Sequence, residues 1–188
     1  MNDANVSAVL GLITDMQPRE PYMLSIDGRC AAGKTTLAAK LSAYLSCAVV
    51  HIDDFYLPFA LRTPERMAKP GGNIDFERLK NEIILPLKSG SDAVYRPYAC
   101  HEDRFLPSVA LSAAKSTIIE GSYSCHPCLA DMLGIKVFMD IAPDKQLSRI
   151  ALRDPGHVEA FRTMWIPREE FYFAECAVRE RCDMVLMN

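Results

Sequence analysis

Residues 28–35, with the sequence GRCAAGKT, have the composition and spacing of a loop that binds phosphate. Two glycines enclose four variable positions and are followed by a lysine and a threonine, which is the pattern of a phosphate-binding loop between a strand and a helix. Its backbone N–H groups form a concave nest, and the next helix points its N-terminus at the same phosphate oxygens. We expect the following residues to bind nucleotide phosphates: Gly28, Arg29, Cys30, Ala31, Ala32, Gly33, Lys34, Thr35 and Thr36.

Lys34 and Thr35 have the two most specific expected roles in this loop. The lysine would contact the outer phosphates, and the threonine hydroxyl would bind Mg²⁺. An apolar run at 22–27 precedes the loop, and a helical pattern at 34–45 follows it. This strand–loop–helix context is the one that supports nucleotide binding.

Two carboxylates, Asp53 and Asp54, directly follow a second apolar run at 48–52. In open α/β sheets ligands bind at the carboxyl ends of the strands. One aspartate could accept a proton from a substrate hydroxyl while the other holds the metal through water. A solvated pair of aspartates that caps a turn is the alternative interpretation. The sequence does not choose between the two aspartates.

Further charged residues follow later strands and helices. Glu120 ends the apolar run 117–119, and we expect it to bind Mg²⁺ or the water around the metal. Arg149 and Arg153 are four residues apart on an expected helix, so both could contact a phosphoryl group during transfer. An ordinary charged helix face would produce the same spacing.

Apolar strand patterns alternate with helical patterns along the chain. We expect strands at 22–27, 48–52, 116–119, 136–141 and 183–187 and helices at 6–13, 34–45, 75–87, 143–153 and 167–181, with Pro86 limiting the third helix. This alternation predicts an α/β fold of the P-loop nucleoside triphosphate hydrolase type, with a five-stranded parallel sheet covered by helices on both faces. We expect one domain over 1–188, functional loops at 53–73 and 95–107, and a short lid at 154–165.

The composition excludes several classes of protein. The net charge is −3, so we expect no nucleic-acid partner. No apolar run is long enough to cross a membrane, and no signal peptide is evident, so we expect a cytoplasmic protein. The cysteine count of 7 is odd, so we expect reduced thiols; the pair Cys125 and Cys128 lacks the second pair that a zinc site needs.

Several segments together resemble the uridine kinase family, which includes phosphoribulokinase and bacterial pantothenate kinase relatives. They are residues 28–36 (GRCAAGKTT), 53–56 (DDFY), 73–76 (NIDF), Tyr98, 120–121 (EG) and 147–154 (LSRIALRD). The resemblance extends over nearly the whole chain, from about residue 22 to residue 187. It implies transfer of the γ-phosphoryl group of ATP to a hydroxyl of a small molecule, in the nucleoside case the 5′-hydroxyl.

The resemblance also implies individual roles. By position Asp53 matches the catalytic base, Thr35 and Glu120 the magnesium side, and Arg149 and Arg153 the lid arginines, with Lys34 on the phosphates. The expected substrate contacts are Asp54, Tyr56, Asp75, Tyr98 and His101. The expected cofactors are ATP and Mg²⁺.

Two further functions stay open at this point. The first is a kinase for another hydroxylated metabolite or for a nucleoside monophosphate. A monophosphate acceptor stays open because Arg62, Arg66 and Lys69 could neutralise its phosphate. A switch module that hydrolyses nucleotide is the other, although the chain has no guanine-selective Asn-Lys-x-Asp motif. The acceptor, the base preference and the association of copies into an oligomer are not determined by these patterns.

Overall fold

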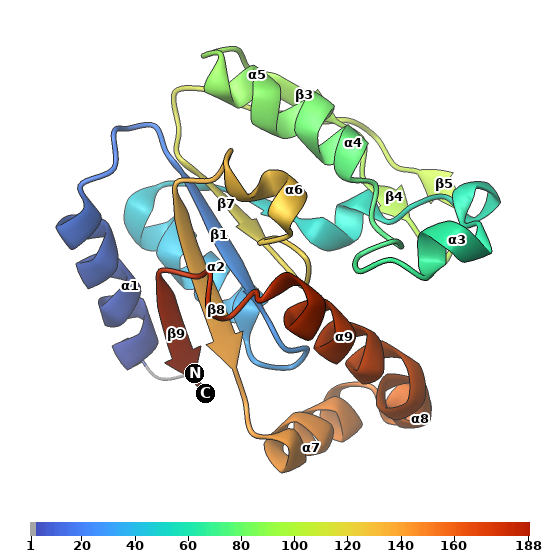
Figure 1. Ribbon diagram of the computed structural model, residues 1–188. Helices are drawn as coiled ribbons and strands as arrows, with labels where there is room; N and C mark the ends of the chain where they lie inside the picture. Colours follow the sequence, from blue (N-terminus) through green and yellow to red (C-terminus); the bar gives the residue numbers. More distant parts are fainter. Residues whose placement is uncertain (1–2) are drawn as a thin grey trace.

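The computed structural model describes residues 3–188. A parallel sheet of 5 strands in the order β2-β7-β1-β8-β9 forms its centre (Figure 1). The strands are β1 (Met23–Gly28), β2 (Ala48–His51), β7 (Thr117–Glu120), β8 (Ile135–Asp140) and β9 (Met184–Met187). These are the five expected strands, to within one residue at each end.

Helices cover both faces of the sheet, as expected. On one face, α1 (Asp3–Met16) and α2 (Lys34–Leu45) pack Val9, Leu37 and Leu41 against alternate strand residues. The other face is covered by α4 (Phe76–Leu79), η3 (Lys80–Ile84), α5 (Leu85–Lys88), α6 (Pro127–Ala130) and α9 (Ile166–Cys176). Strand residues are buried on both sides because each face contacts a helix layer.

The predicted helix 75–87 is present to within one residue at each end. It runs from Phe76 to Lys88 as α4, η3 and α5, is capped by Asp75 and ends two residues after Pro86. The predicted helix 167–181 is shorter than expected. It ends with α9 at Cys176, because Ala177 adopts a left-handed conformation with φ 45°.

The two expected loops contain short ordered elements. The first holds η1 (Ile52–Phe55), η2 (Phe59–Leu61) and α3 (Pro64–Met67). The second holds a hairpin of β4 (Tyr98–Ala99) and β5 (Arg104–Phe105), beside the antiparallel pair of β3 (Ala93–Tyr95) and β6 (Val109–Leu111). The region expected to be a lid follows α7 (Pro143–Arg153) and consists of η4 (Pro155–His157), α8 (Val158–Ala160) and η5 (Phe161–Trp165).

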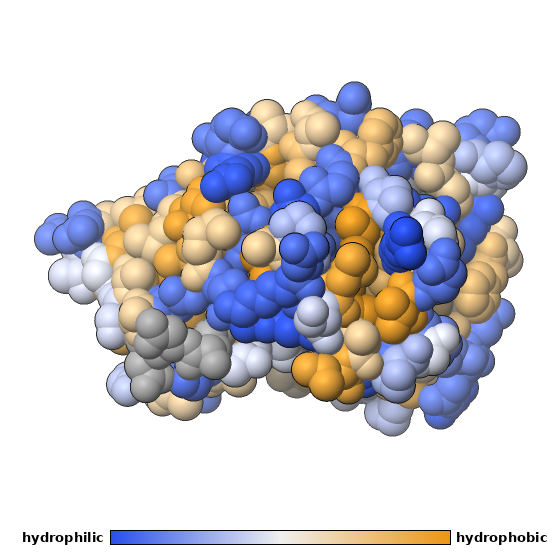
Figure 2. Space-filling model, turned by 90° about the horizontal axis from the view of Figure 1, so that it is seen from below, coloured by the Kyte–Doolittle hydropathy of each residue, from blue (hydrophilic) through white to orange (hydrophobic). Residues whose placement is uncertain are grey.

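The carboxyl ends of β1, β2, β7 and β8 meet at one edge of the sheet because the strands are parallel. Figure 2 views the molecule from below, the direction in which the arrow of β8 points in Figure 1, and shows hydrophilic and hydrophobic side chains side by side. This face therefore offers a ligand both polar and apolar contacts.

A buried carboxylate, Asp27, connects three segments at that edge. It accepts hydrogen bonds from the backbone of Gly28 (2.6 Å), Tyr123 (3.2 Å) and Cys125 (2.8 Å). The Tyr172 hydroxyl of α9 donates a fourth, at 2.7 Å. Burial raises the pKa of Asp27 to about 6, although the Cys125 N–H and the Tyr172 hydroxyl oppose this shift.

The raised pKa of Asp27 predicts a pH-dependent stability. The folded protein holds this proton more tightly than the unfolded chain, whose aspartate titrates at about 3.9. The stabilising contribution is therefore complete below about pH 4 and is lost as the pH rises to about 6. We expect the free energy of unfolding of the wild type to fall by ~1–3 kcal/mol relative to Asp27→Asn over this range.

Urea unfolding of both proteins at several pH values measures this difference. Asp131→Asn, which changes an exposed carboxylate, serves as the control. A difference between wild type and Asp27→Asn that stays constant from pH 4 to pH 7 would contradict the assigned role of Asp27.

Candidate active site

The loop between β1 and α2 is shaped as a concave backbone nest. Gly28, Ala31 and Gly33 have positive φ angles of 128°, 59° and 97°. A Cβ atom on Gly28 would lie 2.0 Å from the carbonyl oxygen of Met139 in β8, so only glycine fits there. The positive φ angles turn successive N–H groups toward one side, which is the geometry of an anion-binding nest.

Lys34 lies at the base of this loop and is buried. Its Nζ donates to the carbonyl oxygens of Gly28 (2.6 Å) and Arg29 (2.9 Å), and it lies 3.4 Å from the Ser122 hydroxyl. No ion pair to Lys34 occurs among the residues that the structure describes. Its positive charge is therefore available to an anion in the nest.

Thr35 and Glu120 lie together beside the loop. The Thr35 hydroxyl donates to Glu120 Oε1 at 3.1 Å, and His51 Nδ1 lies 2.5 Å from the same oxygen. His51 and Glu120 are neighbours because β2 and β7 pair in parallel register. The hydrogen bond to Glu120 raises the pKa of His51, which burial partly opposes.

The oxygens of Thr35 and Glu120 are the kind of ligands that Mg²⁺ binds in proteins. Within residues 3–188, no three His, Cys, Asp or Glu side chains are grouped so that they could hold a metal ion. A hydroxyl and a carboxylate oxygen fit a Mg²⁺ ion of the kind that one or two protein oxygens hold together with phosphate and water.

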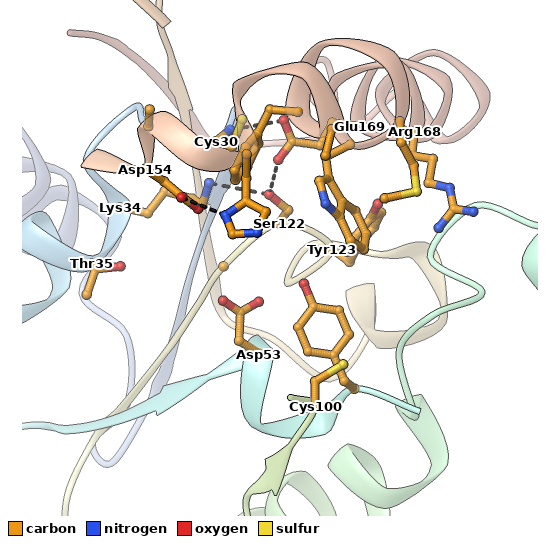
Figure 3. A pocket seen from close by; sticks show the side chains of 18 of the residues that line it. Cys30, Lys34, Thr35, Asp53, Cys100, Ser122, Tyr123, Asp154, Arg168 and Glu169 are labelled. Atoms are coloured by element: carbon orange, nitrogen blue, oxygen red, sulfur yellow. Dashed lines mark hydrogen bonds and ion pairs between the residues drawn. The ribbon is translucent and has the colours of Figure 1, made fainter. Parts of the chain in front are cut away.

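Asp53 faces the loop across a cavity of about 1350 Å³, which both of them line. Its carboxylate is directed toward the side that carries Lys34 and Ser122 (Figure 3). Desolvation raises the pKa of Asp53, and the nearby charge of Lys34 partly counters this. A carboxylate with a raised pKa is a stronger base than an ordinary aspartate.

Four other expected site residues line the same cavity as Asp53. They are Tyr56, His101, Arg149 and Arg153. Arg149 donates to Ala31 O at 3.1 Å, and Arg153 lies over the ring of Phe161 at 5.7 Å.

The structure does not bring three expected substrate contacts to the cavity lining. Asp54 accepts a hydrogen bond from Tyr95 at 3.0 Å. The Asp75 carboxylate caps α4 through the backbone N–H of Arg78 at 3.2 Å. The Tyr98 hydroxyl donates to Asp103, within the hairpin of β4 and β5. Each of these three side chains thus forms a hydrogen bond within the protein, away from the cavity lining.

Members of the expected phosphate loop also differ in exposure to the cavity. Cys30, Ala31, Gly33, Lys34, Thr35 and Thr36 line it, whereas Gly28, Arg29 and Ala32 do not. The Arg29 side chain pairs instead with Asp140 at 2.8 Å and with Glu170. The Arg29 side chain therefore connects the loop to β8 and α9. It would contribute its backbone, and not its side-chain charge, to phosphate binding.

Two residues of the site were missed from the sequence. Ser122 follows the Glu120-Gly121 pair directly, so its position at a strand end was a signal that could have identified it. Glu169 of α9 is 139 residues away from Cys30, whose N–H it accepts at 3.0 Å. No local pattern marks such a contact.

The cysteines are all free. Cys125 and Cys128 do not form a pair: the Cys125 thiol lies 3.8 Å from Cys182 Sγ, and Cys128 lies 3.0 Å from His126 Nδ1. In the described part of the chain, no helix is both long and apolar enough to span a membrane.

Proteins with similar sequences are kinases of nucleosides. The chain is 28% identical over 148 residues to the uridine kinase of Saccharomyces cerevisiae, which covers 71% of this chain and 29% of that protein. It is 27% identical over 146 residues to uridine-cytidine kinase B of Dictyostelium discoideum, covering 72% and 59%. The chain thus spans less than two thirds of the length of either relative. No protein-family model matches the chain.

Two solved structures share the fold. One is described as a possible uridine kinase from Bacillus stearothermophilus, with a TM-score of 0.73, 21% identity and coverage of 96% of both chains. The other is a Saccharomyces cerevisiae protein described as a putative P-loop containing kinase with a circular permutation, with a TM-score of 0.59, 13% identity and coverage of 100% and 99%. The chain therefore has the predicted P-loop kinase fold, and its sequence similarity confirms the resemblance to the uridine kinase family that its motifs indicated.

Proposed function

We propose that the protein is an ATP-dependent kinase that transfers the γ-phosphoryl group to a hydroxyl of a small molecule. The observation that carries this proposal is the position of Asp53, which faces the phosphate loop across one shared cavity. A phosphate nest alone would serve many nucleotide-binding proteins. A carboxylate opposite the nest provides the base that a hydroxyl acceptor requires.

Each residue of the site has a role in this reaction. The nest and Lys34 would hold the phosphates, and Thr35 and Glu120 would hold Mg²⁺, which supplies charge neutralisation at the phosphates when bound. Asp53 accepts the proton that the acceptor hydroxyl loses as its oxygen attacks. Arg149 and Arg153 stabilise the negative charge of the phosphoryl group in transfer.

The acceptor that we propose first is the 5′-hydroxyl of a nucleoside such as uridine or cytidine. The sequence similarity to uridine and uridine-cytidine kinases supports this choice. The cavity that Asp53 lines is also lined by the aromatic side chains of Tyr56, Tyr123 and Trp165, together with His101. Aromatic rings offer a stacking surface to a base, and His101 offers a hydrogen bond.

A second acceptor class has one observation in its favour. Arg62 and Arg168 line the same cavity, and within the described chain neither forms an ion pair with a carboxylate. Arg62 donates to the uncharged carbonyl oxygen of Leu57 at 2.7 Å and lies over the ring of Phe59 at 4.2 Å, and Arg168 lies over the ring of Trp165 at 5.6 Å. Unpaired arginines in a cavity favour an anionic group on the acceptor, such as the phosphate of a nucleoside monophosphate.

An acceptor panel tests the proposed reaction. Purified protein with Mg²⁺ and ATP is incubated with nucleosides, nucleoside monophosphates and other alcohols, and the products are identified by mass. We expect a phosphorylated nucleoside, and its loss in Asp53→Asn, because the amide cannot accept the proton. ATP consumption that is the same with and without every acceptor would instead identify a hydrolase.

Lys34 provides a separate test of the phosphate loop. Lys34→Met keeps the length of the side chain but removes its charge, so we expect turnover to fall by at least ~100-fold, the scale for losing one electrostatic stabiliser. Lys40→Met, on the same helix α2 but away from the cavity lining, is the control. Turnover of Lys34→Met within about threefold of the wild type would show that the loop does not bind the reacting phosphates.

A further inference from the structure

A buried carboxylate occupies part of the phosphate loop. Glu169 of α9 is 5% exposed, and its Oε2 accepts the backbone N–H of Cys30 at 3.0 Å. Its other oxygen, Oε1, accepts the hydroxyl of Ser122 at 2.5 Å. Figure 3 shows both contacts, with the carboxylate reaching down from the helix between Cys30 and Ser122.

The position of Glu169 corresponds to the outer end of the phosphate site. Ser122 Oγ, which donates to Glu169, lies 3.4 Å from Lys34 Nζ. In loops of this pattern the backbone N–H groups hold the α- and β-phosphates, the lysine reaches the β- and γ-phosphates, and the threonine hydroxyl binds Mg²⁺. Glu169 is therefore linked through Ser122, by two successive hydrogen bonds, to Lys34, the residue that reaches the terminal phosphates.

A carboxylate and a terminal phosphate are chemically similar ligands for this location. Both are anions with oxygens that accept hydrogen bonds from backbone N–H groups and from hydroxyls. The Cys30 N–H has a single proton, and two anions in contact within a partly buried site repel each other strongly. A triphosphate that reaches Cys30 must therefore displace Glu169.

We propose that Glu169 is an internal stand-in for the terminal phosphate, which closes the nucleotide-free loop and is displaced when a triphosphate binds. This inference depends on the proposed function, because it takes the nest as the ATP site. Glu169 would keep the Cys30 N–H and Ser122 hydrogen-bonded in the free protein. The site would be ordered and closed in the nucleotide-free protein. ATP affinity would be lower, because ATP must displace Glu169.

The place of Glu169 in the chain connects this displacement to the expected lid. Glu169 lies in the first turn of α9, and helical backbone continues into α9 from η5 through Trp165 and Ile166. Trp165 and Arg168, which lie four residues and one residue before Glu169, line the cavity. Movement of Glu169 off the loop therefore shifts side chains that would surround the acceptor.

Glu169 could alternatively be a positioning residue that holds the Cys30 N–H ready for phosphate. The two roles predict opposite changes in ATP affinity when Glu169 is replaced. Removal of a competitor strengthens ATP binding, whereas removal of a positioning group weakens it.

Nucleotide binding by calorimetry separates the two roles. Glu169→Gln removes the charge and keeps the shape of the side chain, and Glu175→Gln makes the same change on an exposed position of α9. We expect Glu169→Gln to bind Mg-ATP roughly 10- to 100-fold more tightly than the wild type, the range given by a hydrogen bond to a charged group. AMP affinity should change less than about twofold, because AMP lacks the outer phosphates, and Glu175→Gln should match the wild type for both.

Other outcomes would overturn the inference. Unchanged or weaker Mg-ATP binding by Glu169→Gln contradicts a competitive role, as does an equal gain for AMP. If Glu169→Gln does not fold, Ser122→Ala removes one of the two donors to Glu169 and should also strengthen ATP binding. A wild-type protein that binds no nucleotide would overturn the proposed function itself, and with it the role of Glu169.

Discussion

The site depends on one buried carboxylate, Asp27, which joins the phosphate loop to two segments that are distant in sequence. It receives N–H groups from Gly28 and Cys125 and the hydroxyl of Tyr172. These contacts fix the chain after β1, the chain after β7 and helix α9 relative to one another. Lys34, Glu120 and Glu169 belong to these three segments. The hydrogen bonds that Asp27 accepts therefore help to set the positions of these three side chains relative to one another.

Several cations that line the cavity have uncharged partners. Lys34 binds backbone carbonyl oxygens, Arg149 binds Ala31 O, and Arg62 and Arg168 stack on aromatic rings. The acids are divided among the metal side at Glu120, the acceptor side at Asp53 and the loop at Glu169. Within residues 3–188 these lysine and arginine side chains form no ion pair with a carboxylate, so their charge favours the binding of a triphosphate.

Features that depend on neighbouring residues in the sequence could be predicted, whereas contacts between distant residues could not. Residues 28–35 and the five strands were predictable because their signals are local in the chain. The predicted helix 167–181 was too long, because its end at Cys176 depends on the left-handed conformation of Ala177, which the sequence does not indicate. Asp75 was expected at the substrate but caps a helix, a role that its residue type fits equally well. Glu169 was not predictable, because its contact to Cys30 exists only after α9 packs on the sheet.

The central claim is that Asp53 faces the terminal phosphate of ATP across the cavity. A crystal structure with Mg²⁺, a non-hydrolysable ATP analogue and an acceptor alcohol tests it directly. We predict the outer phosphates on Lys34 and the acceptor oxygen within about 3.2 Å of the Asp53 carboxylate. An analogue bound away from residues 28–35, or an Asp53 side chain turned out of the cavity, would contradict the claim.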